Sequence, residues 1–204
     1  MKNIVVIGAN FGDETKGKSV DFFAKQSTPE NTLNIRFSGS NNAGHTVWCN
    51  GKSFVFHLLG AASFRKVPTY LSQHVVVDFV SLYKEMESFF HLTGYRPTVY
   101  VDPRCRVNLP YDVMINRVKE LIRGDGKHGS TGNGLNETID RHQKYPLVAG
   151  QFLESYKQLE LIRENFIAEL KNLVQGITNI NLDEADKKFI NKLLSEDCYS
   201  IFSN

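Results

Sequence analysis

A chain of 204 residues with 41% hydrophobic and 23% charged residues has the size and composition of one soluble globular domain. Its formal net charge of +2 excludes bulk nucleic-acid binding through a basic surface, and no apolar run is long enough to span a membrane. Met1-Lys2-Asn3 leads directly into a predicted strand, not into a signal peptide, so we expect a cytoplasmic protein with neither a nucleic-acid nor a membrane partner.

The first predicted elements form a strand, a glycine loop and a helix. The apolar, β-branched run Asn3 to Ile7 predicts a buried strand, and the run Ser19 to Lys25 predicts the first turns of a helix. The stretch Gly8 to Lys18 between them contains three glycines and two lysines. A helix start offers unpaired N–H groups and a partial positive charge, and glycines let a polyphosphate approach the backbone. We therefore predict phosphate binding here, in preference to a turn that needs glycine for its shape alone.

The same loop matches the P-loop pattern, with Gly12 followed after four residues by Gly17-Lys18-Ser19. Two features differ from an ordinary P-loop. The loop is about four residues too long at its front, and Asp13 and Glu14 lie inside it. Carboxylates repel phosphates unless they hold a metal or take a proton, so a carboxylate here is expected to do chemistry.

The next stretch predicts a strand, a polar loop and a hairpin. Leu33 to Phe37 alternates as a strand does, and it leads into the loop Ser38 to Thr46, which is rich in small and amide residues. Val47 to His57 is predicted to be a hairpin, because Asn50-Gly51 is the strongest short hairpin signal.

The rest of the chain predicts further strands and then mostly helix. We expect strands at 75–77, 98–101 and 199–202, loops at 103–110 and 124–134, and helices at 79–92, 113–123, 153–174 and 184–194. Asp78 is the predicted N-cap and Gly94 the predicted end of the helix at 79–92. This order predicts an α/β fold with a mainly parallel sheet, in a single domain over 1–204 that is mostly helical from 153 onward.

The three cysteines, Cys49, Cys105 and Cys198, are odd in number, and their spacing fits neither a zinc site nor a disulfide framework. We expect buried thiols in a reducing compartment.

Two loops and their separation resemble the amino-terminal half of the adenylosuccinate synthetase family. The first is Gly12-Asp13-Glu14-Thr15-Lys16-Gly17-Lys18, and the second is Asn41-Asn42-Ala43-Gly44-His45-Thr46. Asn50-Gly51, His57-Leu58 and Ser130-Thr131-Gly132-Asn133-Gly134 are similar to the family as well. The resemblance runs from the start to about Arg141 and more loosely to the end, which implies a fold that is incomplete relative to the family.

The resemblance implies a two-step ligase reaction of purine nucleotide biosynthesis. The family couples inosine monophosphate to aspartate with GTP and magnesium. A carboxylate takes the proton from N1 of the purine, O6 attacks the γ-phosphate, and the aspartate amino group then displaces phosphate at C6. We therefore expect magnesium and GTP as cofactors, with ATP as the alternative donor. Since the family is dimeric, we expect a homodimer or a complementing second chain.

By the same resemblance, Asp13 is the base and a magnesium ligand, His45 is the general acid, and Lys16 neutralises the transferring phosphoryl group. The Gly44 carbonyl completes the metal site. The implied nucleotide-binding residues are Gly12, Asp13, Glu14, Thr15, Lys16, Gly17, Gly44, His45 and Thr46. The implied substrate-binding residues are Asp13, Lys16, Asn42, Ala43, Gly44, His45, Thr131 and Arg141.

Departures from the family pattern refine these expectations. A phage branch that makes a 2-amino purine lacks the carboxylate at the Asp13 position, so Asp13 favours inosinate as the substrate. The family continues past a strand like 199–202 into a Glu-Gly-Ala-Gln loop, where this sequence has Ser203-Asn204. We expect the chain to be a fragment that has the catalytic residues Asp13 and His45 and lacks the residues that contact aspartate and guanine.

The residues themselves leave two alternatives. A P-loop kinase or GTPase needs a second acidic strand end for magnesium, and Asp78 and Asp102 are candidates. A non-catalytic nucleotide-binding module would keep the glycine loop without the reaction.

Overall fold

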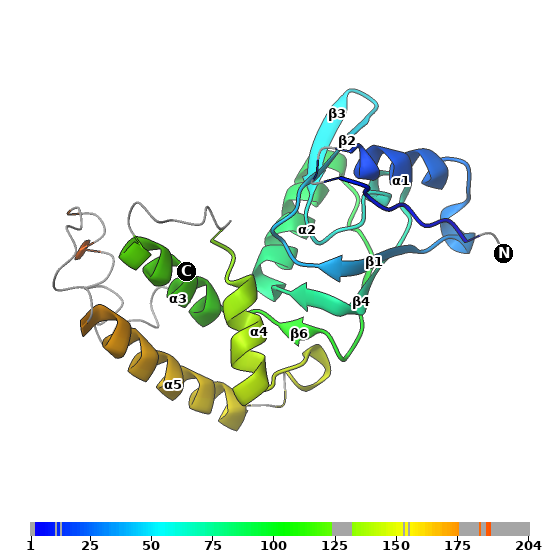
Figure 1. The fold of residues 1–204 in the computed structure, drawn as a ribbon. Coiled ribbons are helices and arrows are strands. Elements are labelled where there is room, and N and C mark those ends of the chain that lie inside the picture. Colours follow the sequence, from blue (N-terminus) through cyan, green and yellow to red (C-terminus); the bar gives the residue numbers. More distant parts are fainter. Residues whose placement is uncertain are drawn as a thin grey trace. The chain divides into compact units, whose positions relative to one another are not determined.

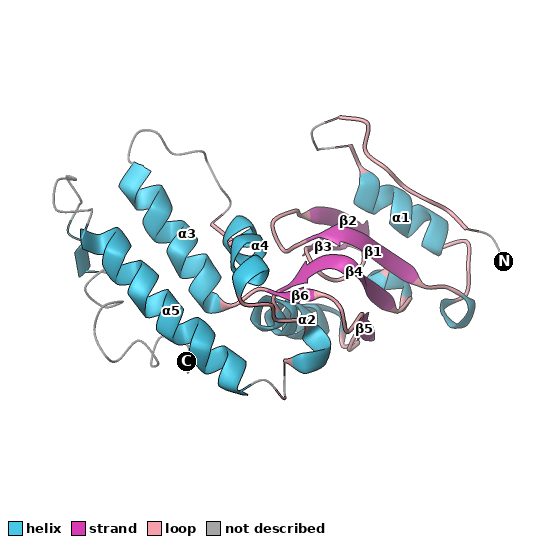
Figure 2. Cartoon of the chain, turned by 60° about the horizontal axis from the view of Figure 1, so that its bottom comes forward, coloured by secondary structure: helices cyan, strands magenta, loops and turns pink. Residues whose placement is uncertain are grey.

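The computed structural model describes residues 3–10, 12, 14–123, 132–152, 154, 156–175, 184 and 187–188. The chain divides into two compact units. Unit 1 is Met1–Val107 with Val148–Gly150, and unit 2 is Asn108–Leu147 with Gln151–Asn204. Among the described residues all strands belong to unit 1 and unit 2 is helical (Figures 1 and 2). The single domain over 1–204 stays a prediction.

The main sheet of unit 1 is parallel throughout, as predicted. β1 (Asn34–Gly39) pairs with β4 (Thr69–Val77), and β4 pairs in turn with β5 (Val99–Val101) and, at its carboxyl end, with β6 (Arg106–Val107). β1 and β4 lie side by side in Figure 1. β4 begins six residues before its predicted start. The polar run Ser72-Gln73-His74 gives no apolar strand signal, although the residues on either side of this run are buried. Helices between parallel strands give the mixed α/β fold.

The predicted hairpin is confirmed. β2 (His45–Cys49) and β3 (Lys52–Phe56) are antiparallel, with His45 opposite Phe56. Asn50 and Gly51 have φ values of 49° and 74°. A two-residue turn with both φ values positive matches the twist of the strands, which is why Asn-Gly is favoured there.

The prediction of a buried strand at residues 3–7 is wrong. Residues 3–8 form no strand, and Val5 and Ile7 are 83% and 81% exposed. An apolar run becomes a buried strand only where a neighbour accepts its hydrogen bonds and another layer covers it. No strand that the structure describes pairs with this run.

Unit 1 contains two α-helices among its described residues. α1 (Lys16–Ala24) begins three residues earlier than predicted, so Lys16 lies in its first turn. α2 (Phe79–Thr93) has its predicted N-cap, since the Asp78 carboxylate accepts the Ser81 N–H at 2.9 Å. It also ends as predicted, at Gly94 with φ 73°. Short 3₁₀ turns occupy Pro29–Asn31, Ser63–Arg65 and Ala149–Gln151.

The core of unit 1 joins α2 to the hairpin through aromatic rings. The ring of Phe89 lies 5.2 Å from that of Phe54, 5.5 Å from that of Phe56 and 5.2 Å from that of Phe64. Phe56 and Phe89 are fully buried. Such a cluster holds β3 against α2, and so fixes the segments at either end of the strand.

Unit 2 contains α3 (Pro110–Arg123), α4 (Leu135–Lys144) and α5 (Tyr156–Gln175). Its core packs Met114, Ile115 and Val118 of α3 against Phe166 and Leu170 of α5. α3 starts three residues before its predicted start. Of the predicted helix at 184–194, only Glu184, Lys187 and Lys188 are described, and they are helical; the predicted strand at 199–202 lies outside the described residues. No helix in the described part of the chain combines the length and apolarity needed to cross a membrane.

Two of the predicted free thiols are described. Cys105 is fully buried and Cys49 half-buried. Burial raises the pKa of the Cys105 thiol to about 11. Cys198 lies outside the described residues.

Candidate functional site

The Glu14 side chain bonds to two other residues of the first glycine loop. One oxygen of its carboxylate accepts the Asn10 N–H at 2.5 Å, and the other accepts Lys16 Nζ at 2.6 Å. The hydrogen bond from Lys16 lowers the pKa of Glu14. A Cβ on Gly8 would lie 2.1 Å from the Glu14 carboxylate, so a side chain at this position would displace the Glu14 carboxylate from its place. Gly12 has φ +136°, which also favours glycine.

The start of α1 packs directly against His45. A Cβ on Gly17 would come within 2.8 Å of the His45 Cβ, so Gly17 is needed for this close approach. Thr15, just before the helix, has a left-handed conformation with φ 60° that turns the loop into α1. The structure thus places Lys16 and Gly17 of the first motif beside His45 of the second.

The second loop presents its backbone to solvent. Asn42, Ala43, Gly44 and Thr46 are exposed, and His45 is half-buried. His57 contacts this loop, since its Nδ1 lies 3.1 Å from the Ala43 carbonyl oxygen. Side chains of the second loop and the exposed Gly44 backbone are therefore open to a ligand, while the loop itself is held.

Positive charge surrounds His45. Burial lowers its pKa to about 4, and the charges of Arg36, Lys16 and His57 add to this effect. His45 is therefore neutral at pH 7 when no ligand is bound. An anionic phosphate beside the ring would favour the protonated form. His45 can therefore act as a general acid only when an anionic ligand lies beside its ring. The cations that lower its pKa would also attract such a ligand.

This charge distribution predicts a pH dependence of stability. The folded protein resists protonation of His45 and the unfolded chain does not, so His45 lowers the free energy of unfolding as pH falls from 6.5 toward 4. A His45→Gln variant should lose less stability than the wild type between pH 7 and pH 5. Urea unfolding of both proteins at the two pH values measures this; parallel losses would contradict the lowered pKa.

Magnesium is tested here by the chemistry of the donors. No cluster of three or more His, Cys, Asp or Glu side chains suited to a metal occurs in the part of the chain that the structure describes. The exposed Gly44 carbonyl is a hard oxygen donor of the kind that magnesium prefers. Asp13, the other predicted ligand, lies outside the described residues. A carboxylate and a carbonyl fit magnesium bound mainly through water and phosphate oxygens.

Sequence reasoning missed two groups near the loops. Arg36 on β1 is half-buried and its charge acts on His45. Asp21 of α1 accepts two hydrogen bonds from Arg65, at 2.8 and 2.7 Å, which ties α1 to the turn at Ser63–Arg65. The alternation of β1 could have placed Arg36 on one face, but nothing local indicates that His45 lies nearby.

Both acidic residues proposed for a P-loop enzyme have partners within unit 1. Asp78 caps α2 and accepts a hydrogen bond from Asn41 at 3.3 Å. Asp102 accepts hydrogen bonds from Arg104 and then Tyr70, which hold the pKa of its carboxyl well below its usual range. These bonds involve both oxygens of each carboxylate, so magnesium would have to compete with them.

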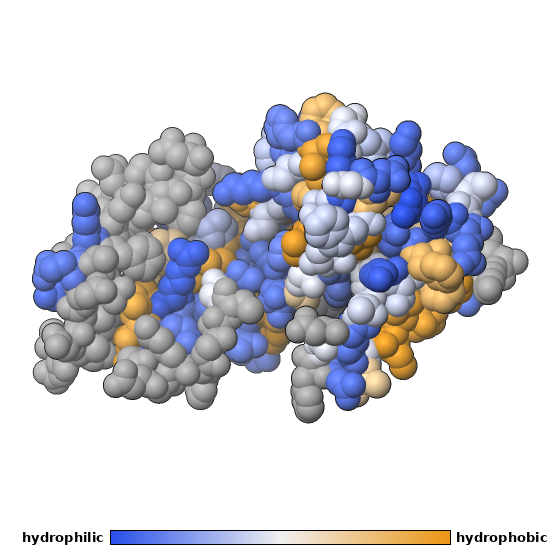
Figure 3. All heavy atoms as spheres, turned by 90° about the horizontal axis from the view of Figure 1, so that it is seen from above, coloured by the Kyte–Doolittle hydropathy of each residue, from blue (hydrophilic) through white to orange (hydrophobic). Residues whose placement is uncertain are grey.

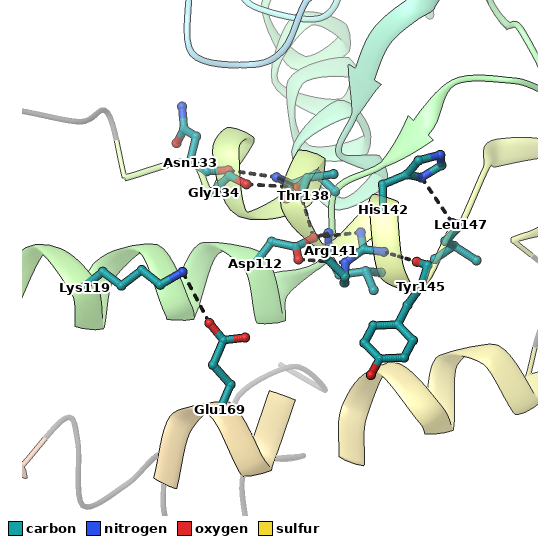
Figure 4. A network of polar contacts seen from close by, with 12 residues as sticks. Asp112, Lys119, Asn133, Gly134, Thr138, Arg141, His142, Tyr145, Leu147 and Glu169 are labelled. Atoms are coloured by element: carbon teal, nitrogen blue, oxygen red, sulfur yellow. Dashed lines mark hydrogen bonds and ion pairs between the residues drawn. The ribbon is translucent and has the colours of Figure 1, made fainter. Parts of the chain in front are cut away.

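Unit 2 holds the end of the predicted loop at 124–134, which takes part in the polar network of Figure 4. Asp112 accepts bonds from Arg141 at 2.8 and 2.9 Å and from Thr138 at 3.0 Å. A Cβ on Gly134 would lie 2.6 Å from the Asp112 backbone, so the loop end packs on the first turn of α3. Thr131 lies outside the described residues. Phosphate binding by Arg141 stays a prediction, and a phosphate would have to compete with Asp112.

Taken with the parallel sheet, these contacts define an α/β protein with a candidate phosphate-binding site in which a lysine, a histidine and a glycine-rich helix start meet. The family model described as Adenylosuccinate synthetase matches residues 5–196. The chain therefore belongs to the adenylosuccinate synthetase family.

Curated relatives agree with this assignment over part of their length. The adenylosuccinate synthetase of Staphylococcus aureus (strain N315) is 35% identical over 167 residues, which are 81% of this chain and 38% of that protein. The Staphylococcus epidermidis (strain ATCC 35984) enzyme is 34% identical over 192 residues, which are 93% of this chain and 44% of that protein. The chain thus spans less than half the length of these relatives.

Solved structures show the same fold. The fully ligated adenylosuccinate synthetase from Plasmodium falciparum has a TM-score of 0.64 and 25% identity, covering 92% of this chain and 44% of that chain. The succinoaminodeoxyadenylate synthetase of cyanophage S-2L, bound to dGMP and to dATP as an energy donor, has a TM-score of 0.55 and 20% identity, covering 74% of this chain and 41% of that chain.

Proposed function

We propose that this chain supplies the phosphate- and magnesium-binding part of an adenylosuccinate-synthetase-type ligase in the cytoplasm. The observation that supports this most strongly is the meeting of Lys16, Gly17 and His45, which come from two separate family motifs. Phosphoryl transfer depends on positioning and on positive charge more than on covalent help, and this arrangement offers both.

In this proposal Asp13 takes the proton from N1 of the inosinate ring, so that O6 can attack the γ-phosphate of GTP and GDP leaves. The aspartate amino group then displaces the phosphate at C6. Lys16 neutralises charge on the transferring phosphoryl group, and His45 acts on the same group as general acid. Glu14 is already bonded to Lys16 and Asn10, which favours Asp13 as the base. Magnesium, held by Asp13 and the Gly44 carbonyl, would neutralise phosphate charge.

We propose that these residues make only some of the contacts that select the substrates. Asn42 is exposed beside His45 and is a proposed contact for inosinate, together with Thr131. The aspartate and guanine contacts would come from polypeptide beyond the part of the relatives that this chain spans. A site without hydrogen bonds to the base cannot discriminate strongly between GTP and ATP.

Exposed apolar residues support a polypeptide partner, either a second copy or a complementing chain. Val5, Ile7, Phe37 and Trp48 are 83%, 81%, 70% and 72% exposed. Figure 3 shows apolar residues in orange at the surface. Burial of such side chains against a second polypeptide would remove apolar surface from water.

The proposal is tested by complementation. The chain would be expressed with a polypeptide covering the part of the Staphylococcus epidermidis relative that it does not span, and adenylosuccinate would be measured with inosinate, aspartate, GTP and magnesium. We expect product from the pair, and from neither polypeptide alone. Product from this chain alone would contradict the proposed division of the site.

A P-loop kinase or GTPase is the second candidate, because the loop keeps Gly12 and Gly17-Lys18-Ser19. It predicts that Lys18, not Lys16, is the essential lysine. A non-catalytic nucleotide-binding module predicts nucleotide binding without product from any complemented pair.

A further inference from the structure

Glu85, in the middle of α2, has a buried carboxylate that receives backbone N–H bonds from three consecutive residues. Its Oε1 accepts from His57 at 2.7 Å and its Oε2 from Leu58 at 2.8 Å, while Leu59 donates to both oxygens at 3.3 Å. Glu85 is 9% exposed. Bonds to an ionised acceptor are roughly twice as strong as neutral ones, so this carboxylate fixes the backbone that follows β3.

His57 connects that backbone to the second loop. Its Nδ1 lies 3.1 Å from the Ala43 carbonyl oxygen. A Cβ on Gly44 would lie 3.5 Å from the His57 ring and 2.9 Å from Val55, so the Gly44 backbone packs directly on β3 and on the residue after it. A shift of residues 57–59 would therefore reach Ala43 and Gly44.

The other end of the same loop is held by the start of α2. The Asn41 side chain donates to the Asp78 carboxylate at 3.3 Å and to the Ser81 hydroxyl at 3.1 Å. α2 thus anchors the 41–45 segment twice, once at its N-cap and once through Glu85. The exposed backbone between the two anchors includes Gly44.

We propose that Glu85 is a positioning residue of the site: it fixes residues 57–59 and, through His57, the backbone of Ala43 to His45. Glu85 touches no substrate; it sets the direction of the Gly44 carbonyl and of the His45 ring. The effect on ligand binding rests on the proposed function, whereas the link between Glu85 and the loop does not.

The test compares Glu85→Gln with Glu87→Gln, a matched control on the same helix whose carboxylate pairs with Arg96 instead. Gln keeps the size of the side chain but presents an amide NH₂ to backbone N–H groups. Two quantities are measured on the full chain: ¹⁵N order parameters of residues 42–45, and the affinity for magnesium GTP by calorimetry.

In the wild type and in Glu87→Gln we expect order parameters of ~0.85, and in Glu85→Gln values below ~0.6. Magnesium GTP should bind roughly tenfold more weakly to Glu85→Gln, because a loosened loop must be ordered when the ligand binds. Unchanged order parameters at residues 42–45 in Glu85→Gln would overturn the proposal, even if residues 57–59 loosen.

The proposed function and the proposed role of Glu85 can be contradicted separately. If the wild type does not bind magnesium GTP, the proposed function fails, while the order parameters still decide the role of Glu85. If Glu85→Gln does not fold, His57→Phe removes the contact to Ala43 and leaves the buried carboxylate in place. Loosening of residues 42–45 in that variant supports the proposal, and unchanged order overturns it.

Discussion

In an assembly that makes adenylosuccinate, the Asp13→Asn variant should lose turnover by a factor of ~10² to 10⁴, the usual contribution of a general base. Binding of magnesium GTP should survive, because Lys16 and the glycine backbone would still contact the phosphates, and the amide oxygen and the Gly44 carbonyl would still be oxygen donors for magnesium. The amide has the shape of the carboxylate but cannot take the proton from N1. Steady-state rates and calorimetric affinities of the two proteins measure the two effects.

Glu30→Gln is the control for this variant, since it removes an exposed carboxylate in the turn after α1. Its rate should equal that of the wild type. Normal turnover by Asp13→Asn would remove Asp13 as the base, and a loss of nucleotide affinity without a loss of rate would leave it only a binding role.

Lys16→Ala should lower the rate by roughly 10² to 10³, whereas Lys18→Ala should change it less than about fivefold. The reason is the position of the two side chains. The charge of Lys16 acts on His45 and its Nζ lies in the closed loop, while Lys18 is exposed. Rates and affinities of both variants decide between the proposed ligase and a P-loop enzyme, in which the order is inverted.

Lys25→Ala removes an exposed cation at the end of α1 and controls for a general loss of positive charge. We expect it to behave as the wild type does. Equal losses in all three variants would show that net charge, not the position of Lys16, attracts the nucleotide.

Local signals were enough to predict much of the fold. The hairpin at Asn50-Gly51 and the capped helix from Phe79 to Thr93 follow from turn and capping chemistry, which acts over a few residues. The strand at residues 3–7 was predicted from an apolar, β-branched run, and this prediction is wrong. Its formation depends on distant pairing, which a local pattern does not contain.

The candidate site could likewise be predicted only in part. The glycines and lysines of the first loop were visible as a motif, and the family resemblance linked them to His45. The surroundings of His45 were not visible, because the charge of Arg36 comes from β1, and Glu85 of α2 bonds the backbone of residues 57–59. The residues that Glu85 bonds lie 26 to 28 positions away in sequence, and only the fold shows which groups Arg36 and Glu85 reach.

The most direct test of the central claim is calorimetric titration of the purified chain with GTP and with ATP, each with magnesium and with excess chelator. If the chain supplies the phosphate and magnesium part of the site without the guanine contacts, both nucleotides should bind weakly, with similar affinity, and only when magnesium is present. Tight binding that is selective for GTP, or binding that ignores magnesium, would contradict this account.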